Sequence, residues 1–197
     1  MIFDYPEQRS HRRHGPAGYA EYESYREWLR DEFCFRCVYC LNRETWGRVT
    51  GDFELDHFVP QSVHPEKALD YLNLVYSCRA CNLTKSDSSI DDPFESLHSD
   101  NLHCGSDGRL VPFSKEATRL ILVLDLNSPQ AIQWRLMWSR IVSLAQQNDS
   151  SLYAMIVGFP GNLPELGRKK PPSNARPEGI SESWHNRSLR NELPESY

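Results

Sequence analysis

Side chains able to carry out acid–base and metal chemistry are concentrated in one short stretch of this chain, residues 53–87. The stretch contains, in order, Asp56, His57, Asn73 and Asn82. Histidine is the side chain whose ordinary pKa lets it take up a proton near neutral pH. Carboxylate and amide oxygens are ligands that hard divalent cations prefer. We therefore expect a site in which His57 acts as a general base and Asp56 offers its carboxylate to a cation.

Four of the six cysteines have the spacing of zinc ligands. They form two Cys-x-x-Cys pairs separated by an insert long enough to fold: Cys37, Cys40, Cys78 and Cys81. Two matching pairs are typical of a structural zinc ion held by four thiolates. In a reducing compartment cysteines are more often metal ligands or buried thiols than disulfides. We expect structural zinc here, with plain buried cysteines or a disulfide as the alternative.

The elements that must position these residues are two strands and a helix. Apolar residues predict a short strand over residues 53–58, ending at Pro60, and a second strand over residues 72–76. A helix that begins at Cys78 carries Cys81, Asn82 and Lys85. This order predicts a ββα unit within an α+β fold. Further upstream, aromatic and apolar residues at helical spacing predict an amphipathic helix over residues 20–33, whose apolar face we expect in the core.

The rest of the chain is expected to be largely helical. A hairpin is predicted over residues 97–111 and a helix over residues 114–126. A longer helix is expected to begin at Ser128, its N-cap, and Pro129, its first residue. His98, His103 and Cys104 lack a fourth ligand at useful spacing, so a second metal site is not expected there.

The composition predicts four segments. Residues 1–18 are expected to be a flexible basic arm, and residues 19–92 the catalytic core with its N-terminal helix. Residues 93–160 form a helical extension packed on that core. Residues 161–197 are rich in proline, glycine and polar residues, so we expect a tail that buries little apolar surface.

Charge and length bound the class of protein. The 197 residues carry a formal net charge of −5, and residues 51–101 are the most acidic part. Such a surplus of carboxylates either binds cations or points away from an anionic substrate. The chain lacks an apolar run of about 18 residues that could span a bilayer. We therefore expect a cytoplasmic protein that makes no membrane contact.

The order of these motifs resembles the HNH endonuclease family in its four-cysteine, ββα-metal form. The resemblance covers residues 37–87 and implies a structural zinc ion and a catalytic divalent cation held by Asp56 and Asn82. Because the second ligand is an asparagine here, the donor set is hard and favours Mg²⁺ or Mn²⁺. By the same resemblance Asn73 orients the loop beside the base.

The resemblance predicts hydrolysis of phosphodiester bonds in DNA. His57 would activate the attacking water, and the cation would stabilise the leaving oxygen. Restriction, phage defence or mobile-element biology is the expected setting. Phosphate contacts are expected from Arg43, Arg48 and Lys85, each with a solvated surface charge as the alternative. Because basic residues are few, a protein partner or a homodimer could supply the missing affinity for DNA.

Two other functions remain open at this point. A zinc-knuckle module that binds nucleic acid or protein without cutting needs only the four cysteines. Asp56, His57, Asn73 and Asn82 would then be coincidences. An RNA-cleaving toxin would use the same chemistry on a different substrate. Cleavage of plasmid DNA separates these three possibilities.

Overall fold

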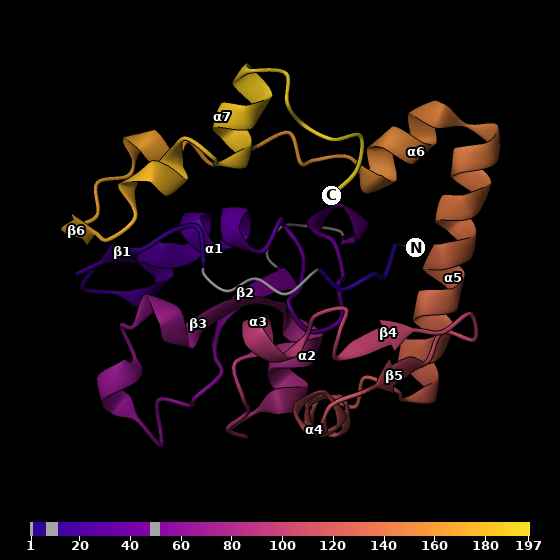
Figure 1. Cartoon of the computed structure of the whole chain (residues 1–197), viewed down its shortest axis with the longest axis horizontal. Helices are drawn as coiled ribbons and strands as arrows, with labels where there is room; N and C mark the ends of the chain where they lie inside the picture. Colours follow the sequence, from indigo (N-terminus) through magenta and orange to yellow (C-terminus); the bar gives the residue numbers. More distant parts are fainter. Residues whose placement is uncertain (1, 7–11, 48–51) are drawn as a thin grey trace.

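The structure is a computed structural model that describes residues 2–6, 12–47 and 52–197. Figure 1 shows the middle of the chain at the centre of the molecule, the C-terminal segment on the side of helix α1, and helices α5 and α6 at one end. A single large hydrophobic core joins the predicted catalytic core to the extension that follows it. Throughout the described ranges, no helix combines the length and the apolar character needed to cross a bilayer.

The predicted ββα unit is present at the centre. Strand β2 (Phe53–His57) pairs antiparallel with strand β3 (Leu74–Cys78), and helix α2 (Arg79–Lys85) follows β3 directly. The register runs from Phe53 opposite Cys78 to His57 opposite Leu74. All five residues of β3 are buried, as expected of a strand covered on both faces. The mixed fold class, α+β, is thereby confirmed.

The second strand begins two residues later than predicted. Residues Tyr71–Asn73 form a single 3₁₀ turn before it, and the carboxylate of Asp70 accepts a hydrogen bond from the backbone N–H of Leu72. A local side-chain bond of this kind favours a turn over a strand. The apolar Leu72 therefore lies in the turn, with its side chain exposed.

The predicted N-terminal helix is split into two parts. Residues Tyr22–Tyr25 form a 3₁₀ turn that continues into helix α1 (Arg26–Glu32). The apolar stripe belongs to the core, because Tyr25, Trp28 and Leu29 are fully buried. Helix α1 packs against β3.

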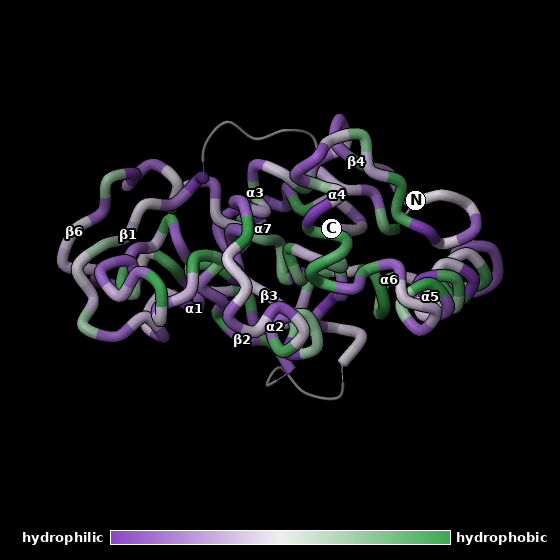
Figure 2. Tube along the Cα trace, turned by 90° about the horizontal axis from the view of Figure 1, so that it is seen from below, coloured by the Kyte–Doolittle hydropathy of each residue, from purple (hydrophilic) through white to green (hydrophobic). Residues whose placement is uncertain are grey.

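The extension contains the predicted hairpin and helices. After the short helix α3 (Pro93–Ser96), strands β4 (Leu102–Cys104) and β5 (Leu110–Pro112) pair antiparallel. Helix α4 (Lys115–Val123), helix α5 (Pro129–Asn148) and helix α6 (Ser150–Val157) follow. The hydroxyl of Ser128 caps α5 at the predicted position. In Figure 2, α6 is largely hydrophobic, whereas α5 mixes hydrophobic and hydrophilic residues around its axis.

The flexible-arm prediction is wrong for the described part of residues 1–18. Arg12 is buried, and its guanidinium donates hydrogen bonds to the carbonyls of Tyr71 and Leu74. It also lies over the rings of Phe33 and Phe94 at 5.1 and 5.4 Å from their centroids. A guanidinium on an aromatic face, with its hydrogen bonds satisfied, can be buried despite its charge. Residues of the arm therefore complete the core.

The prediction of a solvated tail is also wrong. Strand β6 (Ser173–Asn174) pairs with strand β1 (Pro16–Ala17), and helix α7 (Trp184–Leu189) packs beside α1 (Figure 1). The segment adds a few buried aromatics to a small second core instead of forming a core alone. Trp184 is anchored through Asp31 of α1, whose side chain and carbonyl accept hydrogen bonds of 2.8 and 3.0 Å from the Trp184 backbone and indole N–H groups.

Trp184→Ala tests whether this docking stabilises the protein. Because the indole is buried and hydrogen-bonded, its loss should lower the free energy of unfolding by about 3–5 kcal/mol. Leu189→Ala in the same helix is the matched control, since Leu189 is 69% exposed and should change stability by less than about 0.5 kcal/mol. Denaturant titration of both variants measures the difference. Equal stability of the two would contradict the docking.

Candidate active site

The four cysteines meet at one point. Cys37 and Cys40 lie on the loop after α1, Cys78 ends β3 and Cys81 lies on α2. Their Sγ atoms all lie within 4.8 Å of one another, and those of Cys40 and Cys78 are 3.7 Å apart. In a tetrahedral zinc site with Zn–S bonds of about 2.3 Å the sulfurs are about 3.8 Å apart. The cluster therefore fits a structural zinc ion.

Electrostatics favour a dication at this cluster. Hydrogen bonds among the four sulfurs lower the pKa of the Cys78 thiol and raise the pKa of the Cys40 and Cys81 thiols well above the ordinary value. Thiolates packed this closely repel one another unless a cation neutralises them, and zinc binds the deprotonated form. The group is the one set of three or more His, Cys, Asp or Glu ligands that gathers within the described residues.

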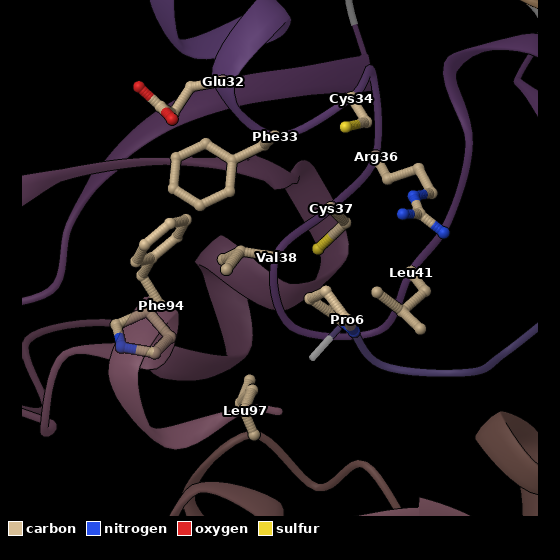
Figure 3. Close-up of a pocket in the computed structure, with 11 residues that line it drawn as sticks. Pro6, Glu32, Phe33, Cys34, Arg36, Cys37, Val38, Leu41, Phe94 and Leu97 are labelled. Carbon is tan, nitrogen blue, oxygen red and sulfur yellow. The ribbon is translucent and has the colours of Figure 1, made fainter. Parts of the chain in front are cut away.

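Apolar side chains pack behind the loop Cys37-x-x-Cys40, which we call the first knuckle; the loop Cys78-x-x-Cys81 is the second. Figure 3 shows Phe33 and Phe94 facing each other beside Val38, with the sulfur of Cys37 nearby. The two rings meet edge to face, with centroids 5.8 Å apart. The cavity left between these residues measures about 40 Å³, which is close to the volume of a single water. No nucleotide fits in this cavity.

His57 ends strand β2 as a half-buried side chain whose ring nitrogens both have polar neighbours. Its Nε2 lies 2.9 Å from the carbonyl oxygen of Ala68. Because a carbonyl only accepts, Nε2 carries the proton and Nδ1 keeps its lone pair. The exposed side-chain amide of Gln61 contacts both ring nitrogens, with its nitrogen 2.9 Å from Nε2 and 3.3 Å from Nδ1. The ring also packs edge to face on Tyr22, at a centroid distance of 4.9 Å.

Asn73 holds the loop that carries Ala68. Its Oδ1 accepts from the backbone N–H of Val59 at 3.0 Å. Its Nδ2 donates to the carbonyls of Val59 at 3.0 Å and Lys67 at 3.3 Å. The side chain is buried and joins both ends of the loop between β2 and β3. This is the geometry of a clamp that keeps the Ala68 carbonyl beside His57.

Asp56 is buried and paired within the chain. Its Oδ1 lies 3.0 Å from Nζ of Lys85, and its Oδ2 accepts a hydrogen bond of 2.5 Å from the hydroxyl of Tyr39. Lys85 also donates to the carbonyl of His57 at 2.8 Å. Burial, followed by the nearby Asp56 carboxylate, raises the pKa of Tyr39 well above its ordinary value, so the phenol remains a donor.

Asn82 does not meet Asp56. Its Nδ2 donates to Oε2 of Glu54 at 2.6 Å. Asp56, in turn, has a partner on each carboxylate oxygen. In this arrangement a divalent cation at Asp56 would compete with Lys85 and Tyr39 for the carboxylate oxygens. Asp56 could take part in metal binding only if the ammonium of Lys85 left its Oδ1.

Two of the predicted phosphate contacts are wrong. Lys85 is 1% exposed and bound to Asp56, and Arg43 is 3% exposed. The Arg43 guanidinium lies 4.4 Å from the centroid of the Tyr197 ring and donates to the carbonyl of Val157 at 3.1 Å. Burial lowers the pKa of Arg43 to about 10. A planar guanidinium that can bind a phosphate can equally donate to a backbone carbonyl and stack on an aromatic ring, as Arg43 does here. Arg48 lies outside the described residues.

The sequence reasoning missed Tyr39, Gln61 and the carbonyl of Ala68. Tyr39 carried a usable signal, because it lies between two zinc ligands and so has a fixed backbone. Its polar tip needs a partner once the ring is buried. The Ala68 carbonyl carried none, since any residue type supplies a backbone oxygen.

These features define a class of protein with a ββα unit built on a four-cysteine, zinc-binding cluster. The model of the HNH endonuclease family matches residues 37–88, which span both knuckles, both strands and α2. The resemblance noted in the sequence is thus confirmed, and the segment is similar to the four-cysteine HNH type. Among curated proteins no match is found.

Cys78→Ser tests the zinc cluster. Zinc binding contributes on the order of 10–16 kcal/mol in small zinc-finger domains, so loss of one thiolate should abolish bound zinc and unfold the ββα unit. Cys104→Ser is the control, because Cys104 is also buried but lies outside the cluster. Zinc content by atomic emission and circular dichroism check both. Full zinc in Cys78→Ser would exclude its role as a ligand.

Lys85→Met tests the buried ion pair. Removing the ammonium leaves the Asp56 carboxylate buried beside an apolar group, which should lower the free energy of unfolding by about 3–5 kcal/mol. Adding Asp56→Asn removes the orphaned charge and should restore most of that loss. Lys115→Met at an exposed position should change stability by less than about 0.5 kcal/mol. Denaturant titration decides, and a double variant no more stable than the single one would contradict the pairing.

Proposed function

We propose that this chain is an endonuclease that hydrolyses phosphodiester bonds of DNA with His57 as its general base. The family match at residues 37–88 supports the nuclease class. The observation that carries the proposal is the 2.9 Å distance from His57 Nε2 to the carbonyl oxygen of Ala68. A general base needs one unprotonated nitrogen that can accept a proton. Because Nε2 donates to the Ala68 carbonyl, Nδ1 is the nitrogen that keeps its lone pair.

The chemistry assigned to the chain begins with a proton transfer. Hydrolysis requires a water positioned in line with the leaving oxygen and a group that takes its proton. Nδ1 of His57 accepts that proton, and the Ala68 carbonyl then stabilises the imidazolium through its Nε2–H, as an acceptor on the far side of a catalytic histidine does in other hydrolases. Asn73 keeps the carbonyl in place. The exposed amide of Gln61 moves aside when the water and the phosphate enter.

The requirement for Mg²⁺ or Mn²⁺ stays a prediction. HNH nucleases use divalent metals, but the oxygens of Asp56 face Lys85 and Tyr39, and the amide of Asn82 faces Glu54. A cation at Asp56 would therefore compete with Lys85 and Tyr39 for these oxygens, whereas the amide oxygen of Asn82 is not the atom that meets Glu54. Both ions are included in the cleavage assay for this reason.

The substrate and setting are proposed from the family and the charge. Double-stranded DNA is the first substrate to test, within restriction, phage defence or mobile-element biology. A formal net charge of −5 gives little non-specific attraction to DNA, because that attraction depends on lysine and arginine contacts. A protein partner or a homodimer is therefore still proposed as the source of affinity.

His57→Ala is the test of the base. Cleavage of supercoiled plasmid with Mg²⁺ or Mn²⁺ should fall by about 10²–10⁴-fold, the usual contribution of a general base. His64→Ala is the matched control, because His64 lies on the same loop, is 47% exposed and pairs with Glu66 at 2.8 Å. It should cut like the wild type. Both variants should retain zinc.

Three outcomes of this assay decide between the functions. Unchanged cleavage by His57→Ala would contradict the assignment of the base. Cleavage of single-stranded RNA with plasmid left intact would favour the RNA-cleaving alternative. Binding of DNA by the wild type without any cleavage, in either metal, would favour the zinc-knuckle binding module.

A further inference from the structure

Tyr39 connects the zinc cluster to the strand that carries His57. It lies between Cys37 and Cys40 in the first knuckle and is completely buried. Its hydroxyl donates to Oδ2 of Asp56, the residue next to His57, at 2.5 Å. The contact therefore joins the structural zinc cluster to the strand of the predicted base.

The backbone of Tyr39 is set by the knuckle. The N–H of Cys37 donates to the carbonyl of Asn42 at 2.8 Å, and the N–H of Leu41 donates to the carbonyl of Cys37 at 3.0 Å. The N–H of Val38 donates to the carbonyl of Tyr76 in β3 at 2.9 Å. These bonds close the loop between the two thiols. A zinc ion that fixes Cys37 and Cys40 thereby fixes where the phenol points.

The end of β2 is held from the other side by Lys85. Its ammonium binds Oδ1 of Asp56 and the carbonyl of His57. Side chains of adjacent strand residues point to opposite faces, so bonds to Asp56 fix the backbone without touching the imidazole. Tyr39 and Lys85 therefore add to the pairing of His57 with Leu74 in setting the direction in which the His57 side chain leaves the strand.

We propose that Tyr39 is a positioning residue that transmits the order of the zinc knuckle to His57 through Asp56. The inference rests on the proposed function and deepens it. Tyr39 is too deeply buried to touch a substrate, so it acts through its neighbour and is not a catalytic residue. Zinc would then have a second effect beyond holding the fold together, because it keeps the base correctly aimed.

Tyr39→Phe removes only the hydroxyl and keeps the ring. Misplacement of a catalytic group by about 1 Å can slow a reaction about 10²-fold, so the single-turnover cleavage rate at saturating enzyme should fall by about 10–100-fold. Zinc content and the dissociation constant for DNA should stay at the wild-type values. In nitrogen NMR of the full zinc-loaded chain, the His57 ring should lose its single fixed tautomer.

Tyr76→Phe is the matched control. Tyr76 is also a buried phenol in the ββα unit that donates to a carboxylate, Glu44, at 2.6 Å. It makes no hydrogen bond to Asp56 or His57. It should therefore retain the wild-type cleavage rate and the wild-type His57 spectrum, even if its stability falls as much as that of Tyr39→Phe.

The proposal is overturned if Tyr39→Phe cuts at the wild-type rate, or if both variants lose the same activity. A normal His57 spectrum in Tyr39→Phe would overturn it as well. Failure of the proposed function gives a different result, because the wild type itself would not cut. In that case the comparison of His57 spectra between the two variants still decides whether Tyr39 positions the ring.

Discussion

The meeting of two Cys-x-x-Cys loops at one point is the constraint on which the rest of this structure depends. Strands of five residues and a helix of seven are too short to persist alone, since isolated hairpins and short helices are marginal in water. At the four sulfurs, the last residue of β3 and the first turn of α2 are tied to the loop after α1. The loop between β2 and β3 is then held by the hydrogen bonds of Asn73.

Around this centre the chain buries an unusual set of charges, and each has a specific partner. Asp56 pairs with Lys85, Glu44 pairs with Arg30 at 2.9 Å, and Asp31 accepts from His14 at 2.7 Å. Buried pairs of this kind contribute little net stability, but losing one partner is costly because a charge is left behind. The interior is therefore well suited to holding these side chains in one arrangement.

The sequence contained enough information to predict the parts of the fold that depend on local chemistry. Cysteine spacing predicted the cluster, apolar patterns predicted β2, and Ser128 with Pro129 predicted the start of α5, because each signal is contained within a few residues. The misses arose where a distant partner changes the meaning of a residue. Arg43 and Lys85 look like phosphate ligands until Tyr197 and Asp56 are placed beside them. The composition of residues 161–197 argues against a separate core. It does not reveal that Trp184 packs into a small core together with Cys34 and Phe35 from the loop after α1.

The contact between Asp31 and Trp184 also bears on the order in which the molecule assembles. The two residues are 153 positions apart in the chain, and contacts of such long range form late because loop closure must precede them. On the ribosome, both knuckles and both central strands are complete well before Trp184 is made. The ββα unit with its cysteine cluster can therefore form first. Helix α1 is covered by α7 only after residues 184–189 have been made. Synthesis from one end to the other thus separates the formation of the ββα unit from the docking of α7 against α1.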